Sequence, residues 1–176
     1  PLTVKPIAEQ GASAIQVSLD FAPEAKAACP HFVGRHIRGV KNGPSPEWLQ
    51  RKLCAIGLRP ISALVDITNL LTYDLSRPLH VFDVRKLQGN LSLRFARAGE
   101  KLAALNDKTY DLPQDAVVIA DDSGVVSLGG IMGGISTGCD DATTDVFLEA
   151  AYFDPARVAR TGRQLQIVSD ARYRFE

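Results

Sequence analysis

The sequence predicts an α+β fold, with an α+β part over residues 1–88 and a β-rich part over residues 89–176. Two segments with helical spacing and capping residues lie in the first part, and short runs of alternating apolar and polar residues follow in the second. The length of 176 residues, 45% of them hydrophobic, suits one compact domain. Because the chain starts at Pro1 without Met, we interpret it as a single domain excised from a larger chain.

The first part begins with two expected strands, at residues 14–20 and 31–40. A helix is predicted over residues 48–56, because Ser45 can cap its free amides and a proline follows at the first helical position. Gly57 is a typical left-handed end for this helix.

A second helix is predicted to start at Ser62, where leucine and isoleucine residues recur at helical spacing, and it carries Asn69. After His80, Asp83 can cap a short turn. In the second part, Asp154 and Pro155 open a helix that Gly162 is expected to close. The expected strands of this part lie at residues 91–95, 101–105, 109–112, 117–120, 125–128 and 145–150.

Composition excludes several classes of protein. Twenty basic and twenty acidic residues give no net charge, so a nucleic acid is expected to be touched over a small area. Three scattered cysteines indicate reduced thiols in a cytoplasm, not a disulfide framework. No apolar run has the length of a membrane span, and no signal peptide is recognisable.

Neither a metal site nor a nucleophilic cysteine is expected. Cys29, His31 and His36 fit no closed four-ligand spacing, and the two histidines would face opposite sides of a strand. Nothing in the sequence brings Cys139 to His80, and its acidic neighbours would raise a thiol pKa.

Four features each leave a structural and a functional interpretation open. The loop Gly129–Gly134 is a tight bend, or it packs backbone against a flat ligand. Glu149, in an apolar strand, points to solvent or is a buried acceptor for a ligand's donor. His80 is a core histidine or handles substrate. The five arginines between residues 157 and 174 form a solvated, salt-bridged face or an anchor for an RNA end.

Five motifs, in order along the chain, carry a family resemblance. They are Gly57–Asn69, Pro78–Asp83, Gly130–Gly134, Phe147–Ala150 and Arg172–Glu176. With them the chain resembles the B3/B4 domain of the bacterial phenylalanyl-tRNA synthetase β subunit. The resemblance implies an α+β fold of B3/B4 type, with a sandwich-like β core, flanking helices and a pocket between the two parts.

The resemblance also implies a function. The family's domain hydrolyses tyrosine attached by mistake to tRNA(Phe), so the expected partners are the acceptor end of that tRNA and the α subunit of a cytoplasmic α2β2 tetramer. No cofactor or metal is implied for the domain, because ATP and Mg serve the parent enzyme's synthetic site elsewhere. The alternative is a non-catalytic module that binds tRNA or braces the tetramer.

By motif position, the implied catalytic residues are His80, Asn69 and Arg59. The implied substrate-binding residues are Glu149, Gly129, Gly130, Gly133, Gly134, Ser169 and Ala171. The chain departs from the family pattern at four positions. Ser76 and Arg77 stand where the family often has glycine and glutamine, Ser169 replaces a frequent threonine, and Arg172 replaces a small residue near the expected pocket rim.

These residue types suit ester hydrolysis by water. An aminoacyl ester is already activated, so positioning and polarising groups suffice without a covalent nucleophile. A buried Glu149 would select tyrosine, because it accepts a bond from the phenol but stays unpaired with phenylalanine. His80 and Asn69 would hold the groups that both amino acids share and order the water.

Overall fold

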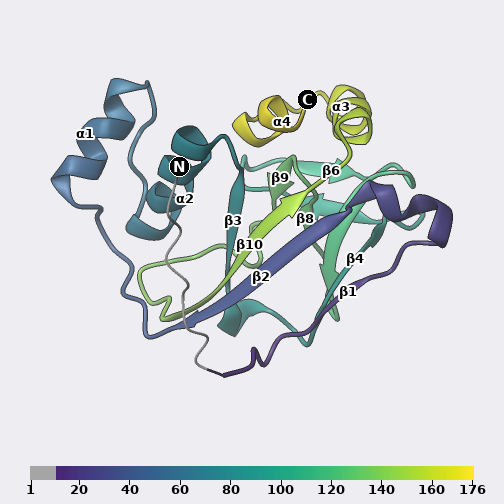
Figure 1. Cartoon of the computed structure of the whole chain (residues 1–176), viewed down its shortest axis with the longest axis horizontal. Helices are drawn as coiled ribbons and strands as arrows, with labels where there is room; N and C mark the ends of the chain where they lie inside the picture. Colours follow the sequence, from purple (N-terminus) through teal and green to yellow (C-terminus); the bar gives the residue numbers. More distant parts are fainter. Residues whose placement is uncertain (1–10) are drawn as a thin grey trace, which may run out of the picture.

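The computed structural model describes residues 11–176, which form two facing β-sheets with helices around one end (Figure 1). The larger sheet has the strand order β1-β4-β7-β8-β9, the smaller one β2-β10-β3, and β5 pairs with β6 in a hairpin. The strands are β1 (Val17–Leu19), β2 (His31–Arg38), β3 (Leu79–Asp83), β4 (Leu91–Phe95), β5 (Lys101–Ala103), β6 (Thr109–Asp111), β7 (Val117–Asp121), β8 (Gly124–Leu128), β9 (Met132–Gly133) and β10 (Asp145–Tyr152).

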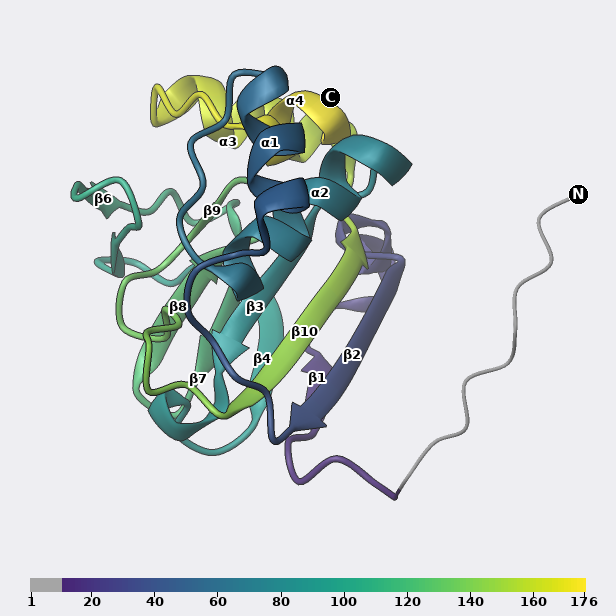
Figure 2. The same cartoon turned by 90° about the vertical axis from the view of Figure 1, so that its left-hand side faces the viewer.

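The helices lie outside the two sheets. Figure 2 shows α2 against the outer side of the smaller sheet, with α1 outside α2 and with α3 and α4 above the ends of the strands. The α-helices are α1 (Glu47–Ala55), α2 (Ala63–Leu75), α3 (Pro155–Gln164) and α4 (Asp170–Phe175), and the 3-10 helices are η1 (Pro23–Ala28) and η2 (Val84–Lys86). The predicted α+β class is therefore confirmed.

The hydrophobic core fills the space between the sheets. Phe82 and Phe147 come from the smaller sheet, and Leu93, Ile119 and Leu128 come from the larger one; all five side chains are fully buried. The alternation of strand residues explains this arrangement, because every second residue of β10 faces the larger sheet. The two parts expected from the sequence, 1–88 and 89–176, share both sheets, since β1 pairs with β4 and β2 pairs with β10.

The first predicted helix is confirmed, but its expected cap is wrong. Ser45 makes no cap bond to α1, and its hydroxyl bonds the buried carboxylate of Asp66 on α2 instead. Asp66 also accepts a bond from the Ile61 amide at 2.9 Å, so this carboxylate ties the segment before α1 to the segment before α2. Gly57 ends the helix with φ +83°, as predicted.

Asp154 caps α3 as predicted, accepting a bond from the Arg157 amide at 2.8 Å. The predicted end at Gly162 is wrong, because the helix continues to Gln164. Gly162 is buried inside α3, and a Cβ there would collide with the side chain of Arg172 on α4. This glycine therefore serves the close approach of two helices and does not terminate one.

The expected strands of the second part are all present, and Asp83 caps η2 by accepting a bond from the Arg85 amide. Four elements were not predicted: η1, the strand β3 that holds His80, the two-residue strand β9 and the short helix α4. Within residues 11–176, no helix has the length and apolar character needed to cross a membrane.

Candidate functional site

The site begins with one pair of facing residues. Glu149 on β10 lies directly opposite His80 on the antiparallel strand β3. Residues opposite each other in such a ladder place their side chains on the same face. Phe147 and Phe82 are the next inward-facing pair, so the two polar residues continue the apolar row that faces the larger sheet.

A cavity of ≈ 70 Å³ lies where this row ends. At about 10–15 Å³ per molecule, it has room for a few waters. Its wall contains His80, Glu149, Gly130, Gly133 and Ala171, which come from β3, β10, the glycine loop and α4. The fold thus brings together five residues that the sequence assigned to the site.

Glu149 is buried, with 6% of its surface exposed, and its Oε2 atom has no hydrogen-bond partner among the described residues. The solvent-facing reading of this residue is therefore wrong. Burial raises the pKa of the Glu149 carboxyl to about 8, because the charged form loses its hydration. At neutral pH the group is mostly a neutral acid, which keeps one accepting oxygen and gains one donor.

His80 is held in the same environment. Its ring meets Phe82 edge-on, with 4.5 Å between the ring centroids, and its Nε2 atom is buried without a partner. Burial lowers the pKa of His80 to about 4, so the imidazole is neutral at pH 7. An unpartnered nitrogen beside a cavity is typical of a binding group more than of a core histidine with all its bonds made.

The glycine loop serves both packing and the site. A Cβ at Gly133 would collide with the His80 ring, so this glycine leaves room for the imidazole. Gly130 has φ +71° and also lines the cavity. Gly129 and Gly134 do not line it: a Cβ on Gly129 would meet Phe153 at 2.8 Å, and one on Gly134 would meet the Val126 carbonyl at 2.6 Å. Packing explains these two.

Helix α4 covers the cavity from above. Ala171 and Phe175 line it, whereas Ser169 lies outside the lining and holds the helix in place. The Ser169 hydroxyl donates to the Ile131 carbonyl of the glycine loop at 2.7 Å and accepts from the Arg172 amide at 3.1 Å. Ser169 is thus an N-cap that joins α4 to the loop.

Two of the expected catalytic residues do not reach the cavity wall. Arg59 is exposed in the connection between α1 and α2, and Asn69 is half-buried on α2. Five further wall residues, apolar or hydroxyl-bearing, were not assigned to the site from the sequence: Pro78, Leu79, Ser127, Leu128 and Phe175. Three of them, Pro78, Leu79 and Phe175, lie in the family motifs, which is the signal that could have found them.

The two arginine departures have structural explanations. Arg172 does not stand at the cavity rim, because its side chain packs over Gly162, bonds Glu176 and donates to the Ile167 carbonyl at 2.8 Å. Arg77 is exposed just before the wall residue Pro78, and its guanidinium carbon lies 5.7 Å from the centroid of the Tyr152 ring.

Thiol and metal chemistry find no support in the geometry. Burial, reinforced by the nearby Glu149, raises the pKa of Cys29 to about 12, and burial with Asp83 raises that of Cys139 to about 11. Both thiols are therefore protonated and unreactive at neutral pH. His31 and His36 lie on opposite faces of β2, and among residues 11–176 no three His, Cys, Asp or Glu side chains gather as metal ligands.

Comparison with known proteins identifies the class. Residues 28–176 match the model of the B3/4 domain, so the chain belongs to the B3/4 domain family. A solved structure, an N-terminal fragment of the phenylalanyl-tRNA synthetase β subunit from Pyrococcus horikoshii, shares the fold with a TM-score of 0.60. The match covers 83% of this chain and 45% of that one at 18% identity.

The sequence relatives are more specific. The chain is 62% identical over its whole length to the phenylalanine–tRNA ligase β subunit of Paramagnetospirillum magneticum, and 57% identical to that of Cereibacter sphaeroides. It spans 22% of the length of each of these relatives. The chain is therefore a B3/4 domain of the kind found in phenylalanine–tRNA ligase β subunits.

Proposed function

We propose that the domain hydrolyses the ester of tyrosyl-tRNA(Phe), with the amino acid bound in the cavity between β3, β10, the glycine loop and α4. The observation that carries the proposal is the pair of unpartnered polar atoms, Glu149 Oε2 and His80 Nε2, on the wall of one cavity. Buried polar atoms without partners are rare in folded proteins, and a mostly apolar pocket with a few such groups is typical of a ligand site.

Glu149 would select tyrosine over phenylalanine. The two amino acids differ by one hydroxyl, and an apolar pocket distinguishes such a pair only by roughly 10²-fold. A phenol can donate to Glu149 Oε2 whether the carboxyl is neutral or ionised. Phenylalanine would instead leave the buried oxygen unpaired, at a cost of roughly 1–3 kcal/mol.

His80 would position the attacking water and not act as a strong base. An imidazole with a pKa of about 4 holds protons too weakly to deprotonate water efficiently. A neutral ring still offers one donor and one acceptor, which can orient water or the ester group. Since the ester is already activated, orientation in a site that excludes bulk water supplies a large part of the rate.

The wider setting follows from the relatives and belongs to the same proposal. The domain would work within a phenylalanine–tRNA ligase in the cytoplasm, beside the α subunit of an α2β2 tetramer, and would receive the acceptor end of tRNA(Phe). The domain itself would need no cofactor, since ATP and Mg act at the synthetic site of the ligase. Asn69 and Arg59 would act from outside the cavity wall.

The test is deacylation of tyrosyl-tRNA(Phe) by the ligase assembled from its α subunit and a full-length β subunit carrying this sequence. We expect wild type to clear tyrosyl-tRNA faster than phenylalanyl-tRNA, and a His80→Gln, Glu149→Leu double variant to lose both the rate and the preference. Phenylalanine activation by the same preparations is the control, because it takes place elsewhere.

A wild-type ligase that deacylates tyrosyl-tRNA(Phe) no faster than the double variant would contradict the proposal. That result would leave the non-catalytic reading, in which the domain binds tRNA or braces the tetramer.

A further inference from the structure

The cavity is too small for the ring that the proposed function places in it. Its volume is ≈ 70 Å³, whereas an apolar cavity that binds one benzene ring measures about 150 Å³. A tyrosyl group consists of a phenol ring with further atoms, so it needs more space than benzene. Binding of tyrosine therefore requires one wall of the cavity to move outward.

Helix α4 is the wall that is best able to move. The other wall residues lie in or next to β3, β8, β9 and β10, and ladder hydrogen bonds fix these strands in the two sheets. Among residues 11–176, the backbone hydrogen bonds of α4 close within the helix and its cap. A helix of six residues is not stable on its own, so side-chain contacts with its neighbours determine its position.

Contacts with α3 hold one side of α4. Arg172 packs over Gly162 and donates to the Ile167 carbonyl at 2.8 Å. Ile167 belongs to the short connection between α3 and α4, and Ser169 at the end of this connection bonds the Ile131 carbonyl. This side of α4 is therefore the one about which the helix can pivot.

Contacts with α2 hold the other side. The Tyr73 hydroxyl donates to Asp170 Oδ1 at 2.9 Å, and the Arg174 guanidinium carbon lies 4.0 Å from the centroid of the Tyr73 ring. Arg174 also donates to Asp170 Oδ1 at 3.3 Å and from Nε to the Thr72 carbonyl at 3.2 Å. We call Tyr73, Asp170 and Arg174 the α2–α4 contact. Tyr73 and Asp170 are 97 residues apart in the sequence, so no short stretch of chain keeps α4 beside α2 when the contact breaks.

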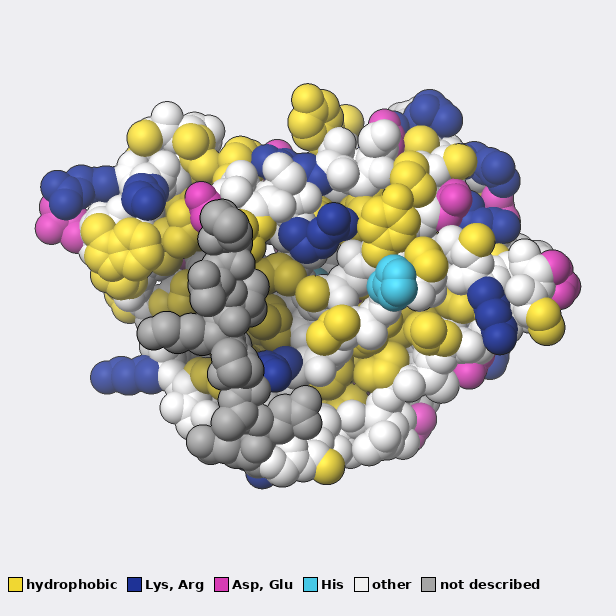
Figure 3. Space-filling model, viewed as in Figure 1, with side chains coloured by type: hydrophobic (Ala, Val, Ile, Leu, Met, Phe, Trp, Pro, Cys, Tyr) yellow, Lys and Arg dark blue, Asp and Glu magenta, His cyan; other side chains and the backbone are white. Residues whose placement is uncertain are grey.

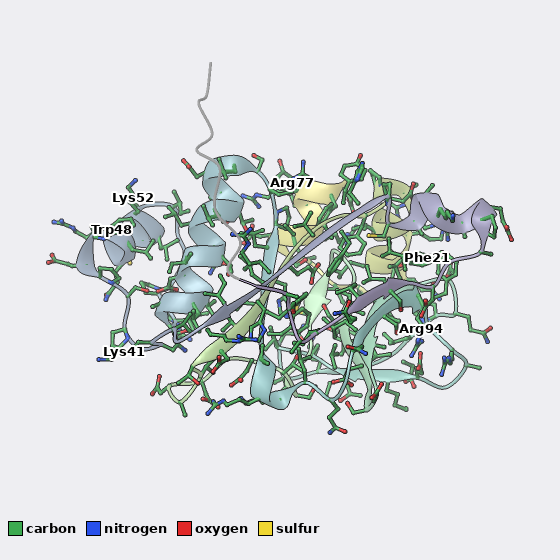
Figure 4. The ribbon with its side chains drawn as sticks, turned by 60° about the horizontal axis from the view of Figure 1, so that its bottom comes forward. Phe21, Lys41, Trp48, Lys52, Arg77 and Arg94 are labelled. Atoms are coloured by element: carbon green, nitrogen blue, oxygen red, sulfur yellow. The ribbon has the colours of Figure 1, made fainter. Side chains whose placement is uncertain are left out.

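The α2–α4 contact lies at the surface of the domain. The Asp170 side chain is 53% exposed, and Figure 3 shows basic and acidic side chains meeting at the upper edge, between α2 and α4. Figure 4 shows Arg77, just after α2, beside the C-terminal helices. Charged contacts that are exposed to water are individually weak, so this one can break at a small cost. The sequence left open whether the arginines of this segment anchor an RNA end; Arg174 is instead engaged within the domain.

We propose that α4 is a movable wall of the cavity, and that the α2–α4 contact controls the entry of the amino acid by holding this wall closed. That the ligand is a tyrosyl group rests on the proposed function. Tyr73, Asp170 and Arg174 are positioning residues, since none of them lines the cavity.

The movable wall has an unusual consequence for affinity. Ala171 and Phe175 line the cavity from α4, so a ligand that displaces them competes with the α2–α4 contact. The apparent dissociation constant is the intrinsic one divided by the fraction of molecules in which α4 is displaced. Weakening the α2–α4 contact raises this fraction and should therefore tighten binding, whereas damage to a fixed wall would weaken it.

The experiment measures hydrolysis of 2′(3′)-O-tyrosyl-adenosine by the ligase assembled from its α subunit and a full-length β subunit carrying this sequence. ATP is omitted, so that the synthetic site stays inactive. This ester carries the amino acid but almost none of the tRNA, so its KM reports on the cavity, and KM approximates the dissociation constant when hydrolysis is slow.

The test variant is Tyr73→Phe, which removes the hydroxyl but keeps the ring beneath Arg174. The matched control is Tyr110→Phe on β6, which removes a hydroxyl that accepts a bond from the Asn106 amide group at 2.8 Å outside the cavity wall.

We expect Tyr73→Phe to lower KM by about three- to tenfold, the effect of one lost hydrogen bond, with kcat no higher than in wild type. The control should keep the wild-type KM. An unchanged or raised KM for Tyr73→Phe would overturn the proposal, because α4 would then be a fixed wall. An equal decrease of KM in Tyr110→Phe would also overturn it, because the effect would not belong to the α2–α4 contact.

Hydrogen exchange in the same β subunit separates this inference from the proposed function. A displaced α4 loses the packing that stabilises it, so Tyr73→Phe should speed exchange of the Tyr173 and Glu176 amides of α4 by about the same three- to tenfold. The Val158 and Leu165 amides of α3 should exchange as in wild type.

If wild type hydrolyses the ester no faster than the His80→Gln, Glu149→Leu variant, yet exchange in α4 is faster in Tyr73→Phe, the movable wall stands and the proposed function fails. Unchanged exchange in α4 would overturn the movable wall, whether or not the ester is hydrolysed.

Discussion

Glu149 and His80 lie opposite each other on neighbouring strands, and each turns a buried atom without a partner toward the same cavity. The same burial keeps both groups neutral at pH 7, because it raises the pKa of the acid and lowers that of the base. A neutral pair of this kind can exchange hydrogen bonds with a ligand without first losing the hydration of an ion.

Glu149→Leu should weaken discrimination between tyrosine and phenylalanine by roughly 1–3 kcal/mol, because the acceptor for the phenol is gone. The measurement is the ratio of deacylation rates for tyrosyl- and phenylalanyl-tRNA(Phe) in the intact ligase. The variant should also be at least as stable as wild type, since a buried, unpaired polar group is replaced by an apolar one of similar size. An unchanged ratio would show that the carboxyl is structural.

His80→Gln should slow the deacylation of both substrates without changing the preference for tyrosine, because the proposed contacts of His80 are to groups that both substrates share. The expected loss is about 10²-fold, the cost of misplacing a reacting group. His31→Gln is the matched control, since His31 is exposed on β2. A changed preference with an unchanged rate would assign His80 to the phenol instead.

The stability of the domain should decrease between about pH 6.5 and pH 8. Glu149 takes up protons more readily when folded, so its contribution is lost as pH rises from 4.5 toward 8. His80 has the opposite slope, because stability rises from about pH 4 to 6.5 while the unfolded chain binds the extra proton. Below pH 6.5 the two groups change the free energy of unfolding with pH in opposite directions. Above pH 6.5 only the contribution of Glu149 still changes.

The decrease should reach at most about 2 kcal/mol, at roughly 1.4 kcal/mol per pH unit for one proton. Urea unfolding of wild type and of Glu149→Gln at pH 6.5 and 8 measures it. Glutamine keeps the shape but does not titrate, so the variant should show a flatter profile. Parallel profiles for the two proteins would mean that Glu149 has an ordinary pKa.

Gly133→Ala should abolish most of the deacylation, because the added Cβ would displace the His80 ring and also meets Leu105 at 3.0 Å. Gly133 has no positive φ, so alanine strains the backbone little and the variant reports on the ring position. Gly138→Ala is the control, since its closest contact is 3.3 Å. Wild-type deacylation by Gly133→Ala would show that the position of the ring is unimportant.

Ser169→Ala should destabilise the domain by about 1 kcal/mol, the usual cost of a lost N-cap, and Ser169→Thr should restore most of it. The Ser169 hydroxyl makes two hydrogen bonds: it accepts one from the Arg172 amide and donates one to the Ile131 carbonyl. Thermal unfolding measures the effect. If the alanine variant lost tyrosine preference at full stability, Ser169 would belong to the ligand site and not to the support of α4.

The sequence allowed the class of fold and most elements to be predicted, because alternation and capping residues are local signals. It also singled out Glu149, since a carboxylate in an apolar strand is unusual before any contact is known. These local signals failed where a residue far away in the sequence determines the role of a side chain or a glycine. Ser45 bonds Asp66 instead of capping α1, and Gly162 accommodates Arg172 instead of ending α3.

The cavity wall shows the same limit. Leu79, Leu128 and Phe175 line it because β3, β8 and α4 meet there, and neither alternation nor capping signals show that these elements meet. Arg59 and Asn69, chosen by motif position, lie in elements whose placement depends on how the α1–α2 connection folds. The glycines of the loop have different roles for the same reason. Gly133 leaves room for the site residue His80, whereas Gly129 leaves room for the core residue Phe153.

The central strand β10 has a consequence for synthesis of the protein. Both of its neighbours, β2 and β3, precede it by long stretches of chain. Four of the five strands of the larger sheet are translated between β3 and β10, and the fifth, β1, is translated before β2. Contacts between distant residues form slowly, and domains emerge from the ribosome from the N-terminus. The backbone edges of β2 and β3 that pair with β10 must therefore wait unpaired on the nascent chain, and during that interval they are open to chaperones and to aggregation.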